Sequence, residues 1–301
     1  MTAIEIPAAF ANAATRAGSQ GRDWIAALPG LVDELLHRWS CAPDGPVLHG
    51  QVGIVVPVRR DDLPPAVLKV SFPHPRNRHE PDAYAAWQGR GATHLFARAD
   101  DHYAMLLERA SHRTLATISD PEEALTIQGR LSHRLSIAAP PDLPRLSDRN
   151  ERWADRIRST AAAFDHPLPQ RVIHAALATV RDLGPGQPAM LVHGDLHDAN
   201  ILASDREPWL AIDPKTYVGD PAHEALNILR SPRFAPPAPL PVPPPHPPPP
   251  PRHLLRSSPT RPHHTRRWLQ FHAVREALWG RRHNDPTWLI RATDNLAEAL
   301  T

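Results

Sequence analysis

The stretch "LVHGDLHDANILASDREPWLAIDPK", residues 191–215, decides the fold of this chain. Polar residues, among them Asp195 and Asn200, lie between the apolar runs "LV" and "IL", and Asp213 follows a further apolar run, "WLAI". Polar residues flanked in this way predict a short loop held between buried strands. Loops on rigid strands are where binding and catalytic side chains concentrate. We therefore expect Asp195, Asn200 and Asp213 to converge on one functional site.

A carboxylate, an amide and a second carboxylate are the groups that phosphoryl transfer from ATP requires. One carboxylate orients the acceptor hydroxyl and takes its proton, while the amide and the other carboxylate hold Mg²⁺ against the phosphates. Oxygen ligands suit Mg²⁺, a hard cation. The neighbouring His193, His197 and Asp198 raise zinc as an alternative. Zinc usually takes nitrogen and sulfur ligands, and no cysteine lies nearby, so we interpret these residues as braces of the loop.

The motifs "HGDLHDAN" and "AIDPK" resemble the catalytic and metal-binding motifs of the aminoglycoside phosphotransferases, relatives of the protein kinases. The short sequences "IDPK" and "VGDPA" are most similar to those of the streptomycin 6-kinase and hydroxyurea phosphotransferase branch of that family. The resemblance implies that Asp195 is the catalytic base and that Asn200 and Asp213 are the Mg²⁺ ligands.

The resemblance covers residues 46–230 closely and residues 268–300 loosely. One position departs from the family pattern, because Glu224 stands where an aspartate is usual. The longer side chain carries one additional methylene group, and this predicts a shifted hydrogen bond at that position.

A lysine upstream provides an independent check. A kinase-type site needs a lysine on a strand for the nucleotide phosphates, held by a glutamate on the next helix. Lys69 lies mid-strand between apolar residues, where an unpaired lysine would be costly to bury. It is one of two lysines among 34 Lys and Arg residues, the other being Lys215. We expect Glu80 to pair with Lys69, with Asp82 as the rival partner, and the resemblance favours Glu80.

Two further ATP contacts are expected in the first third of the chain. The apolar run in "YAMLLERA" predicts a strand that leads into Glu108 and Ala110, where backbone groups would meet the adenine. The run "LHGQVGIVVPV" contains only Gly50 and Gly53 and lacks a protein-kinase glycine-rich pattern. A turn near Gln51 is the candidate cover for the phosphates, and we assign no covering residue there.

The predicted fold is α+β and two-lobed, similar to a protein kinase. Residues 1–110 form a nucleotide-binding lobe, in which 45–110 make a small antiparallel sheet with one helix. Residues 111–230 form a mostly helical catalytic lobe, and residues 268–301 add its C-terminal helices. The resemblance places ATP, with Mg²⁺, between the two lobes.

Helical spacing of apolar residues predicts three helices with distinct boundaries. The first covers 22–39 and is interrupted at Pro29-Gly30. The second runs through 173–183 and stops before "GPGQP". The third follows Gly219, with Asp220 as its N-cap and Pro221 at its first position.

Residues 231–267 form a proline-rich tract, and the whole chain has 37 prolines. Proline lacks the backbone donor that helices and central strands need, so we expect extended, disordered chain here. We consider two origins for the tract: a compensated frameshift, which we favour, or an inserted linker. A frameshift would remove helices that help to form the acceptor site.

Composition bounds the class of protein. The hydrophobic share of 41% and the charged share of 22% are ordinary for a globular protein. The net charge of +2 and the absence of interleaved aromatics argue against nucleic acid as a partner. The single cysteine, Cys41, suits a reducing compartment. With neither a signal peptide nor a membrane-spanning run, we expect a cytoplasmic protein without a membrane partner.

The function expected from these features is ATP- and Mg²⁺-dependent O-phosphorylation of a small hydroxylated antibiotic. By resemblance, that antibiotic is streptomycin or a related cationic aminoglycoside, which implies antibiotic resistance. The alternative within the same class is a kinase for hydroxyurea or another small metabolite. The alternative from another class is a degenerate, non-catalytic nucleotide-binding protein, which the proline-rich tract would explain.

Overall fold

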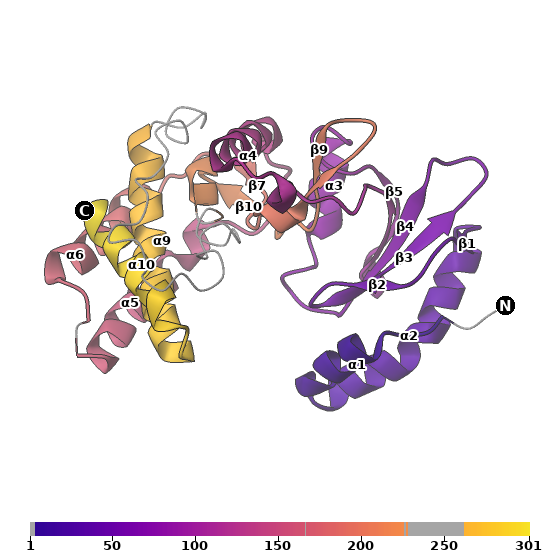
Figure 1. Cartoon of the computed structure of the whole chain (residues 1–301), viewed down its shortest axis with the longest axis horizontal. Helices are drawn as coiled ribbons and strands as arrows, with labels where there is room; N and C mark the ends of the chain where they lie inside the picture. The colour runs from indigo at the N-terminus through magenta and orange to yellow at the C-terminus, as the bar shows by residue number, and fades with distance from the viewer. Residues whose placement is uncertain (1–3, 166, 226, 228–261) are drawn as a thin grey trace. The chain divides into compact units, whose positions relative to one another are not determined.

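The computed structural model describes residues 4–165, 167–225, 227 and 262–301, drawn in colour in Figure 1. The chain divides into two compact units, Met1–Ser111 (unit 1) and His112–Thr301 (unit 2). Unit 1 holds an antiparallel sheet, and unit 2 is mostly helical. The α+β class predicted from the sequence is therefore confirmed.

Unit 1 is built on a six-stranded sheet in the order β1-β3-β4-β6-β5, with β2 also pairing with β3. The strands are β1 (Ala42–Pro43), β2 (Leu48–His49), β3 (Gly53–Arg59), β4 (Ala66–Ser71), β5 (Leu95–Ala99) and β6 (Ala104–Glu108). All pairs are antiparallel. In the antiparallel sheet expected over residues 45–110, β3 pairs with β4 and β5 pairs with β6 as hairpins.

The two faces of this sheet carry different helices (Figure 1). The helices of unit 1 are α1 (Ala8–Ala14), α2 (Ser19–Arg38) and α3 (Glu80–Trp87), with short 3-10 turns at Thr15–Ala17 and Asp100–His102. On β4, Leu68 and Val70 point into a core shared with α1 and α2. Because side chains alternate along a strand, Lys69 points to the opposite face, where α3 begins.

Helix α2 is continuous through Pro29, so the predicted interruption at this proline is wrong. A proline inside a helix costs about 3 kcal/mol. The helix buries Leu28, Val32 and Leu35 completely in the unit 1 core. Each such side chain contributes roughly 1.5–3 kcal/mol, so tertiary packing outweighs the local penalty.

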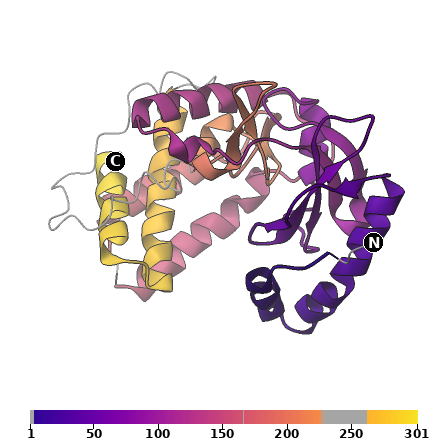
Figure 2. The same cartoon turned by 45° about the vertical axis from the view of Figure 1, so that its right-hand side comes forward.

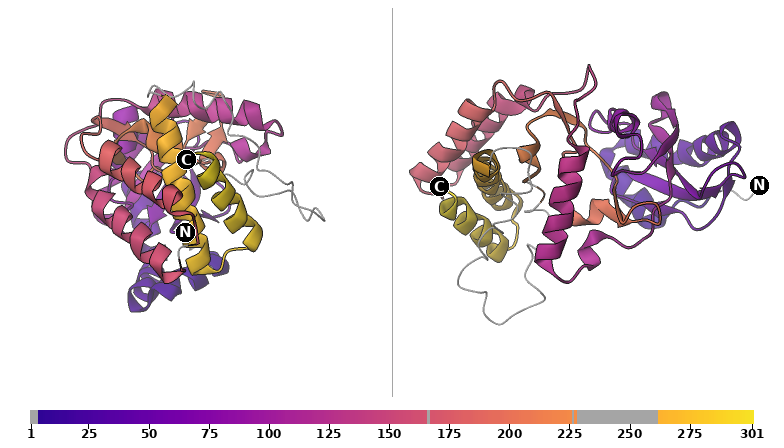
Figure 3. Two further views of the ribbon diagram at one scale, coloured as in Figure 1. Left: turned by 90° about the vertical axis from the view of Figure 1, so that its left-hand side faces the viewer. Right: turned by 90° about the horizontal axis from the view of Figure 1, so that it is seen from above.

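Unit 2 contains five described α-helices, seen from further directions in Figures 2 and 3. They are α4 (Pro121–Leu135), α5 (Asn150–Ala163), α6 (Gln170–Leu183), α9 (Pro262–His283) and α10 (Thr287–Ala299). The predicted helix over 173–183 is α6. Helix α9 packs against α5, α6 and α10, and its buried Trp268 and Phe271 lie in the main core of unit 2.

Helix α9 begins at Pro262, inside the region that the sequence assigned to the proline-rich tract of 231–267. Proline fits the first turn of a helix because its missing N–H would have no intrahelical partner there. The following turn is held by tertiary contacts, since Thr265 is buried and Arg267 donates to Asp182 at 2.8 Å. The remainder of the tract lies outside the described residues.

Two small antiparallel ribbons carry the polar stretch of unit 2. Strand β7 (Met190–Val192) pairs with β10 (Tyr217–Gly219), and β8 (Ile201–Ala203) pairs with β9 (Trp209–Ala211). Short 3-10 helices lie at Leu115–Thr117, Ser147–Arg149, Asp198–Asn200 and Pro221–Ala225. The predicted loop between buried strands is confirmed, because residues 193–200 connect β7 to β8.

The segment predicted to be a helix after Gly219 begins as a 3-10 turn. Asp220 caps the turn, since its Oδ1 accepts a hydrogen bond from Ala222 N at 3.0 Å. The turn at Pro221–Ala225 is a 3-10 helix, and residues 228–230 lie outside the described residues.

Among the helices that the structure describes, none combines the length and apolar character needed to cross a bilayer.

Candidate active site

The ion pair predicted for Lys69 lies within unit 1. Lys69 Nζ on β4 donates to Glu80 Oε1 at the start of α3, at 2.6 Å. The Glu80 side chain is 2% exposed and that of Lys69 13% exposed, so this is a buried ion pair. Asp82 is engaged elsewhere, with His79 and Arg98, each at 2.9 Å. The structure therefore brings Lys69 together with Glu80 and not with Asp82.

The residues expected to meet adenine lie at the end of β6. The Glu108 carboxylate accepts a hydrogen bond from His94 N at 3.0 Å, and Glu108 N donates to His94 O at 2.9 Å. Arg109 N donates to Pro65 O at 3.0 Å. These bonds fasten the strand end within the sheet. Ala110 follows and is half-buried.

The turn between β2 and β3 is the candidate phosphate cover. Gly50 N donates to Gly53 O at 2.9 Å, and Phe72 N donates to Val52 O at 2.7 Å. A Cβ at Gly53 would lie 2.7 Å from Val70 O, which is closer than real Cβ contacts. Gly53 is therefore explained by the close approach of β4, and Val52 is exposed.

The loop after β7 is organised by His193, which is almost fully buried. Its Nε2 donates to Ile212 O at 3.0 Å, and its Nδ1 accepts from Asp195 N at 3.2 Å. Burial lowers the pKa of His193 to about 4, so the ring is neutral and suits one donor and one acceptor. Lys215 N also donates to His193 O, at 2.7 Å. These contacts fit the bracing role that the sequence analysis gave to His193.

The groups expected to hold Mg²⁺ are positioned by the β8–β9 ribbon. Asn200 Nδ2 donates to Asp195 O at 2.9 Å, which leaves the amide oxygen as the end that can bind a cation. Asn200 O accepts from Ile212 N at 2.9 Å, so Asn200 and Asp213 lie at the same end of the ribbon. The Asp195 side chain is 16% exposed, and its Oδ2 lies 3.9 Å from His197 Nε2.

The donor set fits Mg²⁺ better than zinc. Asn200 and Asp213 offer oxygen atoms, and Mg²⁺ binds through few protein ligands while substrate phosphates and waters complete its shell. Across residues 4–165, 167–225, 227 and 262–301, no group of three or more His, Cys, Asp and Glu side chains could hold a metal ion. The cluster of His193, His197 and Asp198 therefore does not form a zinc-type site in the described residues.

Glu224 is a residue whose role the sequence analysis did not identify. Its Oε1 accepts a hydrogen bond from Gly194 N at 2.8 Å, and its other oxygen accepts from Asn227 Nδ2. Burial, together with the nearby Asp195 charge, outweighs these donors and raises the pKa of Glu224 to about 7. The longer side chain thus still fastens the loop that carries Asp195. The glutamate at a position where aspartate is usual was the sequence feature that could have identified this role.

Lys215 is a second residue to which the sequence analysis gave no role. Its Nζ donates to Asp213 Oδ2 at 2.8 Å. Asp213 has a φ of 58° and Thr216 a φ of 52°, in the left-handed region that non-glycine residues rarely adopt. The rarity of lysine in this chain was the signal that could have identified it.

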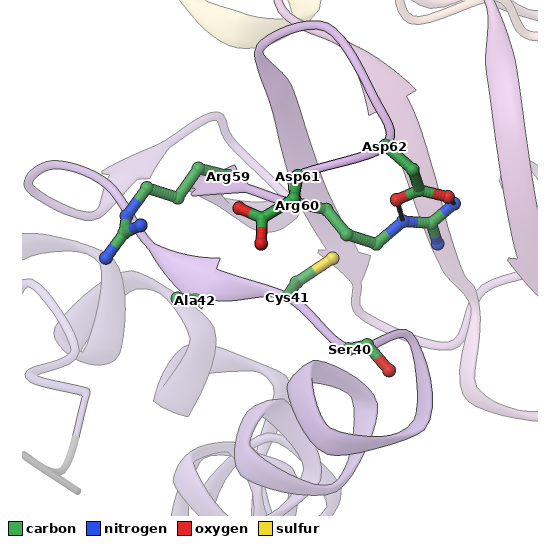
Figure 4. A pocket seen from close by; sticks show the side chains of 7 residues that line it. All are labelled: Ser40, Cys41, Ala42, Arg59, Arg60, Asp61 and Asp62. Atoms are coloured by element: carbon green, nitrogen blue, oxygen red, sulfur yellow. Dashed lines mark hydrogen bonds and ion pairs between the residues drawn. The ribbon is translucent and has the colours of Figure 1, made fainter.

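A separate hollow of about 690 Å³ lies at the turn between β3 and β4, and it contains none of the predicted site residues (Figure 4). It is lined by Ser40, Cys41, Ala42, Arg59, Arg60, Asp61 and Asp62. Arg60 is paired with Asp62 at 2.6 Å. Burial raises the pKa of the Cys41 thiol, which disfavours a reactive thiolate.

Comparison with known proteins identifies relatives of this chain. The model of the aminoglycoside/hydroxyurea antibiotic resistance kinases matches residues 38–283. A streptomycin 6-kinase from Streptomyces glaucescens is 37% identical over 232 residues, which cover 76% of this chain and 75% of the relative. A hydroxyurea phosphotransferase from Kitasatospora aureofaciens is 35% identical over 231 residues, covering 75% of this chain and 68% of the relative.

Solved structures show the same fold. A choline kinase from Streptococcus pneumoniae superposes with a TM-score of 0.53 at 11% identity, covering 91% of this chain and 98% of the other. A macrolide 2'-phosphotransferase from Brachybacterium faecium superposes with a TM-score of 0.52 at 16% identity, covering 90% and 98%. These similarities show the two-lobed kinase-like fold expected from the sequence.

Proposed function

Because the chain belongs to the aminoglycoside/hydroxyurea antibiotic resistance kinase family, we propose that it transfers the γ-phosphoryl group of ATP to a hydroxyl of streptomycin or a related aminoglycoside. The chain is a phosphotransferase that acts on hydroxyl groups. The observation that carries the choice of substrate is its 37% identity to a streptomycin 6-kinase over three quarters of both chains. The Lys69–Glu80 pair and the braced loop of Asp195 support the chemistry.

In the proposed reaction, Asp195 accepts the proton of the substrate hydroxyl while that oxygen forms a bond to the γ-phosphorus. The bond between the γ-phosphorus and the oxygen bridging to ADP breaks, and ADP leaves. Lys69 binds the ATP phosphates, and Glu80 holds Lys69 in place. Asn200 and Asp213 would hold Mg²⁺, which neutralises charge on the phosphates when bound.

The product chemistry explains how such a reaction protects a cell. Streptomycin is cationic, and a phosphate group adds a charge of about −1.5 to −2 at neutral pH. The added charge and bulk would weaken binding of the drug to an anionic target. We place the reaction in the cytoplasm, where ATP is available.

The relatives also support a second candidate substrate, hydroxyurea, because a hydroxyurea phosphotransferase is 35% identical. The deciding experiment incubates the purified chain with Mg²⁺ and γ-³²P-labelled ATP, and with streptomycin or hydroxyurea in parallel. We expect labelled streptomycin. Label in hydroxyurea alone would transfer the proposal to that substrate. ATP binding without any labelled product would favour a non-catalytic nucleotide-binding protein.

The position of the new phosphate tests the proposal further. Identity to the streptomycin 6-kinase is 37%, against 32% to a streptomycin 3''-kinase from Klebsiella pneumoniae over 67% of this chain. We therefore expect phosphorylation at the 6-hydroxyl. Phosphorus–proton correlation in the NMR spectrum of the product identifies the modified carbon, and the Asp195→Asn variant is the matched control for enzyme-dependent labelling.

A further inference from the structure

Lys215 has an unusual place in this chain. Arginine supplies almost all of the 34 basic Lys and Arg residues, and lysine occurs only at positions 69 and 215. The first lysine has a role in the proposed reaction, as the strand cation for the ATP phosphates. The second lies two residues after Asp213, a proposed Mg²⁺ ligand, and its side chain is 20% exposed. A freely solvated surface lysine would be much more exposed.

The backbone holds Lys215 against the catalytic loop. Lys215 N donates to His193 O at 2.7 Å, and Thr216 N donates to the same oxygen at 3.2 Å. Asp213 and Thr216, on either side, both have positive φ. Such residues each cost on the order of 1 kcal/mol or more and persist where the surroundings impose them, often at functional sites. The segment therefore keeps a strained path that places Lys215 beside Asp213.

The charges around this position favour an additional cation. Asp195 N donates to His193 Nδ1 at 3.2 Å and Lys215 N to His193 O at 2.7 Å, so both residues are held on His193. Asp213 joins them through its contact with Lys215 Nζ at 2.8 Å. Two carboxylates and one ammonium leave this region negative until Mg²⁺ is present. ATP then brings several negative charges, and charge spreads over the γ-phosphoryl oxygens during transfer. The ammonium has three donors, and its contact with Asp213 Oδ2 uses one of them.

We propose that Lys215 binds the transferred phosphoryl group, as a second phosphate-binding lysine that bridges this group and Asp213. Lys215 takes no part in bond exchange. It donates hydrogen bonds to the γ-phosphoryl oxygens while the acceptor oxygen attacks and ADP leaves. This inference rests on the proposed function and adds a contact that distinguishes ATP from ADP.

The test compares two nucleotides with and without a γ-phosphate. Calorimetry measures binding of ADP and of a non-hydrolysable ATP analogue, both with Mg²⁺, to the wild-type chain and to Lys215→Met. A charge-assisted hydrogen bond contributes about 1.5–3 kcal/mol, which corresponds to roughly 10- to 150-fold in affinity. We expect the variant to lose about that factor for the ATP analogue and less than about 2-fold for ADP. We also expect kcat to fall by about 10²–10³-fold.

Two variants act as controls. Lys215→Gln keeps a donor that can reach Asp213 and serves the same comparison if Lys215→Met does not fold. Arg181→Met removes one positive charge at a side chain that is 75% exposed and paired with Asp182, and it should leave both affinities unchanged.

Parallel loss of affinity for both nucleotides would overturn the inference, because it would mean that Lys215 serves only Asp213 and the metal. Unchanged affinity and unchanged kcat in Lys215→Met would overturn it as well, while the proposed kinase function would stand. If the wild-type chain binds both nucleotides but phosphorylates no acceptor, the proposed function fails. The ratio of the two affinities then still decides the role of Lys215.

Discussion

Lys69 and Lys215 each pair with a carboxylate, but the surrounding backbone holds them differently. Lys69 lies in a regular strand, opposite Val55 on one side and Met105 on the other, so sheet register determines its position. Its partner Glu80 comes from α3 and is almost fully buried. Lys215 lies in an irregular segment whose partner, Asp213, is two residues away and 30% exposed.

The difference indicates which of the two lysines also contributes to the stability of the fold. Removing one member of a buried ion pair leaves a charge in a poorly solvated place and costs about 3–5 kcal/mol. A pair with partial access to solvent, such as Lys215–Asp213 at 20% and 30% exposed, contributes about 1 kcal/mol or less. The sheet lysine is therefore expected to matter for folding and for ATP, whereas the loop lysine is expected to matter mainly for chemistry.

The largest expected effect is on turnover and concerns the loop. Asp195→Asn should lower kcat by about 10²–10⁴-fold, because it removes the general base, and should leave the affinity for Mg·ATP nearly unchanged. Asp213→Asn should weaken Mg·ATP binding as well as turnover. Steady-state kinetics and calorimetry separate the two effects. Near-wild-type kcat in Asp195→Asn would contradict its assignment as the base.

The comparison of the lysines is tested directly by chemical unfolding. Lys69→Met should lower the free energy of unfolding by about 3 kcal/mol, because Glu80 loses its ion-pair partner in a buried position. Lys215→Met should lower it by about 1 kcal/mol or less. Guanidinium titrations of both variants at pH 7 provide the measurement.

A matched control for Lys69→Met is Asp82→Asn. It removes a carboxylate that is 30% exposed from α3, the helix that carries Glu80, and should lower the free energy of unfolding by no more than about 1 kcal/mol. Lys69→Arg should restore little turnover, because a planar guanidinium does not replace a compact ammonium on the phosphates. Equal destabilisation by Lys69→Met and Lys215→Met would contradict the contrast drawn between the two regions.

Glu224 gives the loop region a pH-dependent stability. Its pKa is about 7 in the folded chain, against a usual value of 4.5. Between these pH values the folded state keeps a proton that the unfolded state has lost, so this contribution to stability falls as pH rises. One proton corresponds to about 1.4 kcal/mol per pH unit, or on the order of 3 kcal/mol over the range.

His193 acts in the opposite direction, because its pKa is lowered from 6.5 to about 4. The unfolded state holds the additional proton between these values, so this contribution rises with pH. The pH dependences of the Glu224 and His193 contributions to stability largely cancel between pH 4.5 and 6.5. Glu224→Gln should reveal the His193 effect, as stability that increases across that range in urea titrations. A stability difference between wild type and variant that does not change with pH would mean that the Glu224 pKa is not raised.

The smallest expected effect sharpens the role of Glu224 in fastening the loop. Glu224→Asp introduces the residue that is usual in the family, but it shortens by one methylene group the side chain that reaches Gly194 N at 2.8 Å. Loss of the hydrogen bond from Gly194 N should lower the free energy of unfolding by about 1 kcal/mol. A few-fold loss of kcat should accompany it, with KM for ATP unchanged. A gain in stability would show that the turn at Pro221–Ala225 adjusts to the shorter side chain.

The sequence by itself determined the fold class, the family, and the strand and helix that carry Lys69 and Glu80. The family followed from the resemblance of the motifs "HGDLHDAN" and "AIDPK" to known ones. The strand and the helix followed from short-range patterns: alternation along a strand, apolar spacing along a helix, and polar residues between apolar runs. The loop of Asp195 and Asn200 was predictable for the same reason. Each of these patterns is complete within a few dozen residues.

Only the tertiary structure decided the remaining features. Glu224 reaches Gly194 N from 30 residues away. Helix α2 continues through Pro29 because its buried side chains outweigh the local penalty. Residues 262–267 belong to helix α9, whose Trp268 and Phe271 lie in the unit 2 core. The positive φ at Asp213, which places its carboxylate beside Lys215, is likewise imposed by the surrounding loop. Local propensities amount to a few kcal/mol at most, and burial and long-range hydrogen bonds of equal size can reverse them.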